Sequence, residues 1–171
     1  MGLLDILNQY AGGAAAPQAD TVNHFDQVAQ QAPTADLGSA LSAMFRSDAT
    51  PAFGQQVSDL FNRSNPQQQA GVLNQIIQSV GPGVLGAAGG VLGRILGGGS
   101  AAAPGTVPTI TPAQASQLSP ADVGALAAHA ERHDPSIVDQ VGSFYAEHPT
   151  LVKSLGAAAL AIALGHMRSS N

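Results

Sequence analysis

The same helical pattern occurs twice along this chain. Its positions in the first copy are Ala35, Asp36, Leu37, Gly38, Arg46, Asp48, Pro51, Gln56, Val57, Leu60 and Phe61. The matching positions in the second copy are Ala121, Asp122, Val123, Gly124, Arg132, Asp134, Pro135, Gln140, Val141, Phe144 and Tyr145. The spacing is the same except for Ala49-Thr50, which is inserted before the proline of the first copy. Because the repeated positions are apolar face residues, helix starts and turn prolines, the duplicated object is a helical packing unit, and no set of catalytic groups is duplicated with it.

The rest of the chain also has the pattern of amphipathic helices. Apolar residues recur at three- and four-residue spacing, and no segment alternates apolar and polar residues as a strand would. Prolines that follow a capping-type residue mark helix starts, at Thr50-Pro51, Asn65-Pro66, Thr111-Pro112, Ser119-Pro120, Asp134-Pro135 and, with a weaker cap, His148-Pro149. We therefore expect an all-α chain. The predicted helices are 2–10, 19–31, 35–46, 51–62, 66–79, 112–117, 120–132, 135–147 and 149–167.

A glycine-rich apolar segment occupies residues 82–97 of the chain. If it is helical, four glycines share one face, Gly86, Gly90, Gly93 and Gly97. Each glycine costs a helix about 1 kcal/mol relative to alanine, so such a helix needs a second backbone packed closely against that face. A flexible glycine-rich loop is the alternative, and insertion into a bilayer is a third one that Arg94 argues against.

A Gly/Pro-rich linker over residues 98–111 follows this segment. It divides the chain into an N-terminal helical module, residues 1–97, and a C-terminal helical module, residues 112–171. Each module contains one copy of the repeat.

Near the C-terminus, residues 155–165 are apolar on every side, which is typical of a buried helix. The segment is shorter than the roughly 20 residues that cross a bilayer. We interpret it as a core helix, with a subunit interface as the second interpretation and a membrane span as the last. Together, the two apolar segments predict an interface made of small and aliphatic residues, namely Gly86, Gly90, Gly93, Gly97, Leu155, Ala159, Ile162 and Ala163.

Candidates for chemistry are few. His129 and His133 are four residues apart on a predicted helix and could share a metal ion, but no third ligand stands at a suitable distance, so a solvated polar face is the favoured interpretation. In each copy an arginine lies where a helix should end, and an aspartate two residues later lies where the next helix should be capped. These residues are Arg46 and Asp48 in the first copy and Arg132 and Asp134 in the second. No nucleophile elbow or phosphate-binding loop occurs. We predict no enzymatic activity, no catalytic residue, no cofactor and no metal site.

The composition points toward association. Charged residues make up 10% of the chain, whereas about 25% is usual in a soluble domain, and a weakly charged surface does little to keep folded proteins apart. With 6 Lys and Arg there is no basic patch for nucleic acid. The lack of cysteine fits a reducing compartment, and the opening residues lack the basic region of a signal peptide, so we expect a cytoplasmic protein.

Three stretches carry a resemblance to a known group of proteins: the opening Gly2-Leu3-Leu4-Asp5, the glycine-rich centre, and the C-terminal residues 134–153. They resemble small, uncharacterised bacterial proteins of the YidB-like kind, which are helical and rich in Ala and Gly. The resemblance implies a bacterial source and a helical fold. It implies no activity and no site.

The sequence favours a non-enzymatic structural or scaffolding protein that self-associates, as a homo-oligomer or a filament, through helical apolar and small-residue faces. A peripheral membrane protein that uses Leu3-Leu4, Ile6-Leu7 and the glycine-rich segment at a bilayer surface is one alternative, although interfacial helices usually present more Lys and Arg. An adaptor that binds another protein is a second alternative. A metal-binding protein or enzyme centred on His129 and His133 is the third.

Overall fold

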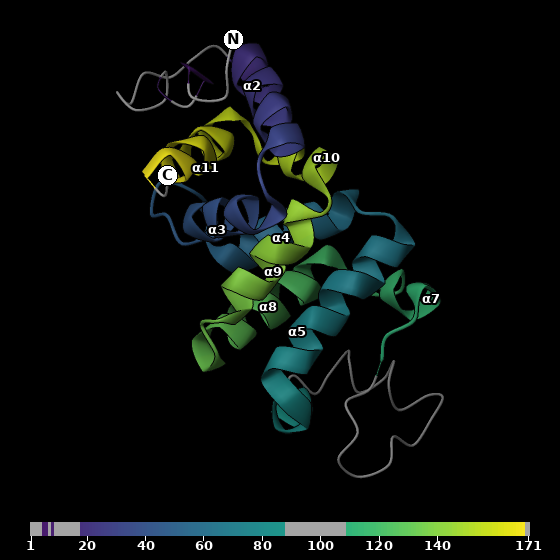
Figure 1. Ribbon diagram of the computed structural model, residues 1–171. Helices are drawn as coiled ribbons and strands as arrows, with labels where there is room; N and C mark the ends of the chain where they lie inside the picture. The colour runs from purple at the N-terminus through teal and green to yellow at the C-terminus, as the bar shows by residue number, and fades with distance from the viewer. Residues whose placement is uncertain (1–4, 7, 9–17, 88–108, 170–171) are drawn as a thin grey trace. The chain divides into compact units, whose positions relative to one another are not determined.

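The computed structural model describes residues 5–6, 8, 18–87 and 109–169, and all regular structure in them is helical (Figure 1). The all-α prediction is confirmed for this part of the chain. The helices are α2 (Gln18–Gln31), α3 (Thr34–Phe45), α4 (Phe53–Arg63), α5 (Pro66–Ala87), α7 (Pro112–Ala115), α8 (Pro120–His133), α9 (Ile137–Ala146), α10 (Pro149–Val152), the 3-10 helix η1 (Lys153–Leu155) and α11 (Ala157–Ser169). Of the helix predicted over 2–10, Asp5, Ile6 and Asn8 are helical, and the remaining residues lie outside the described ranges.

The chain forms two compact units. The first combines Met1–Ala52 with Val138–Asn171, and the second is Phe53–Ile137. These units do not coincide with the modules 1–97 and 112–171 drawn from the sequence, because each unit takes helices from both modules.

In the first unit, α11 packs against α2 and α3 (Figure 1). The apolar face of each helix points inward, as its three- and four-residue spacing predicts. The core contains fully or almost fully buried side chains from four helices, including Phe25, Val28, Leu37, Leu41, Met44, Phe45, Val141, Tyr145, Leu160 and Leu164. An ion pair at the unit's edge joins Lys153 Nζ to Asp26 at 2.6 Å.

The predicted helix 149–167 is three shorter elements, α10, η1 and α11. The break occurs at Gly156, whose φ of 97° is a backbone conformation that side chains other than glycine rarely adopt. The Gly156 carbonyl accepts a hydrogen bond from the Leu160 N–H, so α11 begins directly after the break. The single-helix prediction was wrong because a glycine inside an apolar run gives no sign of its φ.

In the second unit, α4 packs lengthwise on α8, and α5 packs against α7 and α8 (Figure 1). The buried side chains of this core include Phe53, Val57, Leu60, Phe61, Val72, Leu73, Ile76, Ile77, Ile110, Val123, Leu126 and Ala127. The stripes predicted from periodicity for α4 and α5 are therefore core faces.

Three of the six helix starts read from proline are capped as expected. The Ser119 and Thr111 side chains accept from the N–H groups of Asp122 and Gln114. Asn65 Oδ1 accepts from the Gln68 N–H at 2.9 Å. The side chain of His148 makes no capping hydrogen bond at the start of α10. In α5, α7 and α8 the capping side chain therefore satisfies one of the backbone donors that a helix start leaves without an intrahelical partner.

The remaining two helices begin later than predicted. The Thr50 hydroxyl donates to the carbonyls of Met44 and Ser47, so it closes the end of α3, and α4 begins at Phe53 instead of 51. Asp134 Oδ1 accepts from the Ser136 N–H at 3.0 Å in a turn that delays α9 to Ile137. Hydrogen bonds from the side chain and backbone of Ser136 hold the pKa of Asp134 below its usual range.

The glycine-rich segment is in part a continuation of α5, which runs past the predicted end at 79 to Ala87 and includes Gly86. Gly90, Gly93, Gly97 and the linker as far as residue 108 lie outside the described residues. The end of the predicted linker is part of the second unit, since Ile110 is buried in its core.

Asn74 on α5 holds the chain where it enters α7. Its side-chain amide accepts from the Ile110 N–H at 2.7 Å and donates to the Ile110 carbonyl at 3.1 Å. We expect Asn74→Ala to lower the free energy of unfolding by about 2 kcal/mol, because two partly buried backbone groups lose their partners. Urea unfolding followed by circular dichroism measures this. Gln75→Ala on the next, half-buried position is the control, and equal effects of the two variants would show that the amide pair contributes nothing.

Candidate functional site: two close helix pairs

The α4/α8 pair brings two backbones together at glycine. A Cβ added to Gly124 would lie 2.7 Å from the Gly54 carbonyl oxygen and 3.0 Å from the Ser58 Cβ. A Cβ added to Gly54 would meet the Gly124 carbonyl oxygen and lie 2.9 Å from the Ala128 Cβ. Distances this short do not occur for real Cβ atoms, so both positions require glycine for the helices to pack as they do.

The α3/α9 pair is built in the same way. A Cβ added to Gly142 would lie 2.5 Å from Ser42 Oγ and 2.9 Å from the Gly38 carbonyl oxygen. A Cβ added to Gly38 would lie 3.2 Å from Ser143 Oγ. Small residues therefore line the contact on both helices, and Phe45 and Tyr145 extend it with their ring centroids 6.5 Å apart.

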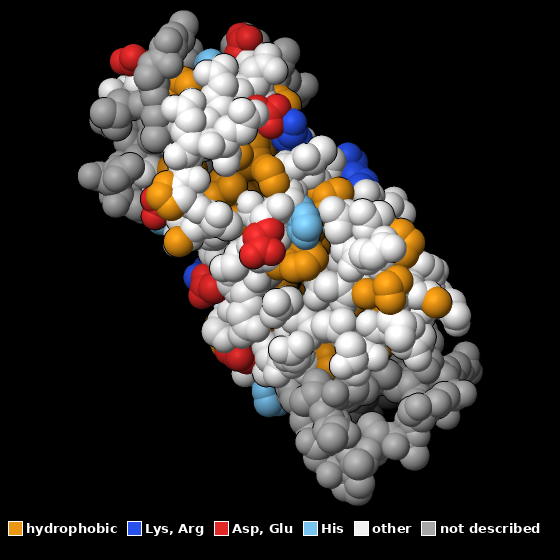
Figure 2. Space-filling model, turned by 45° about the vertical axis from the view of Figure 1, so that its right-hand side comes forward, with side chains coloured by type: hydrophobic (Ala, Val, Ile, Leu, Met, Phe, Trp, Pro, Cys, Tyr) orange, Lys and Arg blue, Asp and Glu red, His pale blue; other side chains and the backbone are white. Residues whose placement is uncertain are grey.

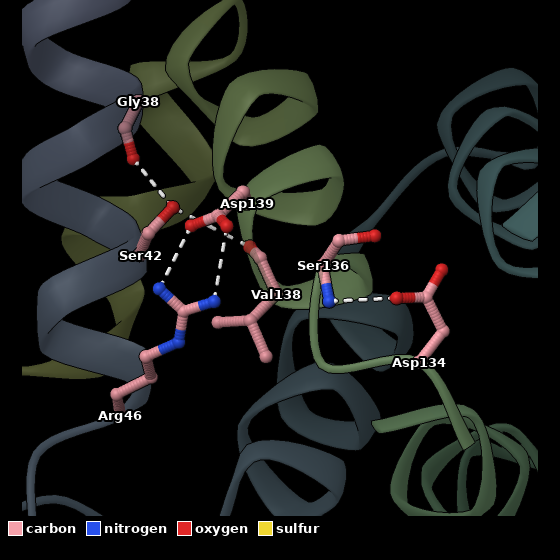
Figure 3. A network of polar contacts seen from close by, with 7 residues as sticks. All are labelled: Gly38, Ser42, Arg46, Asp134, Ser136, Val138 and Asp139. Atoms are coloured by element: carbon pink, nitrogen blue, oxygen red, sulfur yellow. Dashed lines mark hydrogen bonds and ion pairs between the residues drawn. The ribbon is translucent and has the colours of Figure 1, made fainter. Parts of the chain in front are cut away.

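Polar contacts accompany the α3/α9 pair (Figure 3). The buried Ser42 hydroxyl donates to the Gly38 carbonyl at 2.9 Å, and it lies 3.5 Å from the Val138 carbonyl of α9. At the end of α3, the Arg46 guanidinium forms a two-pronged contact with the Asp139 carboxylate, both N–O distances being 3.0 Å. The two side chains are 46% and 55% exposed, so water screens the ion pair, while its two parallel hydrogen bonds fix the orientation of the two side chains.

Both arginines of the repeat lie at helix C-termini as the spacing predicted, Arg46 as the C-cap of α3 and Arg132 in the last turn of α8. Arg46 pairs with Asp139, which is distant in sequence, and Arg132 Nε donates to the Ala128 carbonyl within α8. Sequence reasoning missed Asp139 because an exposed acid in a helix carries no sign of a distant partner. The second aspartate of the repeat, Asp134, caps the turn before α9 as described above.

The predicted interface residues lie in different surroundings. Ala159 and Ala163 are buried in the first unit, so α11 is a core helix over this face. Leu155 and Ile162 are half-buried. Gly86 lies in α5, and the other three predicted glycines lie outside the described ranges. Close contacts occur at four other glycines. Gly38 and Gly124 were recognised as repeat positions but not as contacts, and Gly54 and Gly142 were not selected at all.

His129 and His133 lie on the same helix with ring centroids 6.5 Å apart. Among the described residues, the buried His129 Nδ1 has no hydrogen-bond partner. Within the described ranges, no group of three or more His, Asp or Glu side chains is placed to hold a metal ion.

The surface is sparsely charged. On the face shown in Figure 2, acidic and basic side chains are scattered among uncharged polar and backbone atoms, with apolar side chains between them. None of the helices in the described part of the chain is both long and apolar enough to cross a membrane. The described arrangement is suited to holding helices together closely. No protein family, curated protein or solved structure was found to match this chain.

Proposed function

We propose that this chain is a non-enzymatic structural protein that self-associates through its close helix pairs. The observation that carries the proposal is that both pairs depend on close contact at glycine, and that two of the four glycines, Gly38 and Gly124, occupy matching positions of the repeat. A helical unit kept twice for its packing face is the kind of element from which assemblies are built. The proposal includes a cytoplasmic location and the YidB-like relationship that the sequence suggests.

Two further observations support self-association. Charged residues are 10% of the chain, and the face in Figure 2 shows them dispersed. Such a surface offers little electrostatic repulsion to a second copy. Second, half-buried apolar residues remain on α11 opposite its buried face, including Ala161 and Ile162.

The test is the mass of the purified native protein, measured by light scattering on a sizing column at several protein concentrations. We expect a mass that is a multiple of 17.1 kDa and that grows with concentration. Apolar contacts are not screened by salt, so the mass should not fall when the ionic strength is raised. Negative-stain images of the same fractions show whether the assembly closes into a ring or extends. A monomer at every concentration and salt would overturn the proposal.

A further inference from the structure

We propose that two copies of this chain associate by exchanging the halves that carry the two copies of the repeat. The inference rests on the proposed self-association. It names the partner, a second copy of the chain, and the surfaces that join them, the α3/α9 and α4/α8 pairs.

Each copy of the repeat consists of a leading helix and a following helix. The leading helices are α3 and α8, and the following helices are α4 and α9. In each copy the two helices belong to different compact units. In the first copy, α3 lies in the first unit and α4 in the second. In the second copy, α8 lies in the second unit, and α9 apart from Ile137 lies in the first. Each pair therefore joins the leading helix of one copy to the following helix of the other.

The leading glycine of each copy faces the equivalent position of the following helix. In the spacing of the repeat, Gly38 corresponds to Gly124, and Gly142 corresponds to Ser58. A Cβ on Gly142 would lie 2.9 Å from the Gly38 carbonyl oxygen, and a Cβ on Gly124 would lie 3.0 Å from the Ser58 Cβ. The facing positions are equivalent in the two units, although different atoms meet there.

A second pair of equivalent positions is close one helical turn further along. Ser42 corresponds to Ala128, and Val138 corresponds to Gly54. The Ser42 hydroxyl lies 3.5 Å from the Val138 carbonyl, and a Cβ on Gly54 would lie 2.9 Å from the Ala128 Cβ. Equivalent positions therefore face each other in both pairs, although the closest backbone approach is between Gly38 and Gly142 in one pair and between Gly54 and Gly124 in the other. This likeness supports the assignment of the pairing between the two copies to the repeat itself.

The two halves of the chain can also come from two different copies. The α3/α9 and α4/α8 pairs each need one helix from the first half of the chain, which ends with α5, and one from the second half, which begins with α7. The contacts are identical whether the two halves belong to one chain or to two, which is why exchange of equivalent elements is a low-cost route to dimers. The connection between the halves only raises their local concentration, so the balance between one chain and two depends on the protein concentration.

The first experiment uses two wild-type chains with different affinity tags. One sample is mixed after each chain has folded, and the other is unfolded together in urea and refolded together at high concentration. We expect the two tags to co-purify after joint refolding and not within minutes of mixing folded chains, because exchange requires both helix pairs to separate. Equal co-purification in the two samples would show association of folded surfaces, and absence of mixed species after joint refolding would overturn the exchange.

The second experiment uses complementary full-length variants. Gly38→Val with Gly54→Val disables the first half, and Gly124→Val with Gly142→Val disables the second half. Each variant alone should lose the cooperative thermal transition of the wild-type chain. After joint refolding, the unsubstituted halves of the two chains combine, so a transition at the wild-type midpoint should return. A curve equal to the average of the two separate variants would overturn the proposal.

The outcomes separate the two proposals. A wild-type mass above that of the monomer without complementation leaves self-association standing and removes exchange. A strictly monomeric wild-type chain overturns self-association and, with it, exchange between native copies, and complementation would then show only that the substituted chains can pair. Gly165→Ala combined with either variant pair is the control, because nothing lies within 4 Å of the Cβ that it adds, and it should not alter complementation.

Discussion

Gly54→Ala should lower the free energy of unfolding by about 2 kcal/mol, although alanine is the better helix former. The added Cβ would meet the carbonyl oxygen of Gly124 and lie 2.9 Å from the Ala128 Cβ. Neither atom belongs to a flexible side-chain end that could move aside. The α4 and α8 backbones must therefore separate, and the neighbouring core contacts loosen with them. Urea unfolding monitored by circular dichroism measures the loss.

Gly165→Ala is the matched control for this prediction. Gly165 also lies inside a helix, α11, but no atom of the described residues lies within 4 Å of a Cβ placed there. This variant should be more stable than the wild type by up to about 1 kcal/mol, the usual difference in helix propensity. If Gly54→Ala is stabilising by the same amount, α4 and α8 do not pack at the described distance.

Phe61→Ala and Tyr145→Ala should each lower the free energy of unfolding by about 3–5 kcal/mol. The two side chains occupy the same position of the repeat, and they are 1% and 0% exposed. Truncation removes a large apolar contact and leaves a cavity that a close-packed core cannot refill. Since a domain of this size is stable by only about 5–15 kcal/mol, each variant approaches the limit of folding.

The location of each loss is a sharper readout than its size. Phe61 lies in the second compact unit and Tyr145 in the first. Amide hydrogen exchange should therefore rise first in α4 and α8 for Phe61→Ala, and first in α3 and α9 for Tyr145→Ala. Phe144→Ala, on the half-buried neighbour of Tyr145, should cost clearly less. Identical exchange patterns for the two large-to-small variants would contradict the division into units.

Much of the local structure was predictable because its causes are local. Proline after a capping residue marked the starts of α7 and α8, and the Asn65 cap marked that of α5. Apolar spacing identified which residues of α4 and α5 are buried. These predictions hold because a cap satisfies donors within its own first turn, and because an amphipathic face must be covered whatever its partner.

Predictions failed where a distant group competes for the same atoms. The Thr50 hydroxyl has the right position to cap α4, but it donates to α3. The glycines of residues 82–97 were predicted to form an interface because many of them occur close together. The glycines at which the described helices pack closely are single glycines in ordinary amphipathic helices. Sequence alone does not distinguish a glycine that a backbone approaches from one that faces solvent, as Gly124 and Gly165 illustrate.

The sequence by itself determined that the chain is helical, where most of its helices begin, and which faces they bury. Only the tertiary structure decided the partners, α3 with α9 and α4 with α8. The physical reason is that an apolar stripe with a glycine in it is complementary to any similar stripe. The apolar spacing of α3 is similar to that of α8, and the spacing of α4 is similar to that of α9, so the pattern alone does not say which of these helices pair. The choice between them depends on turns and on the rest of the core, which act only when the whole chain has folded.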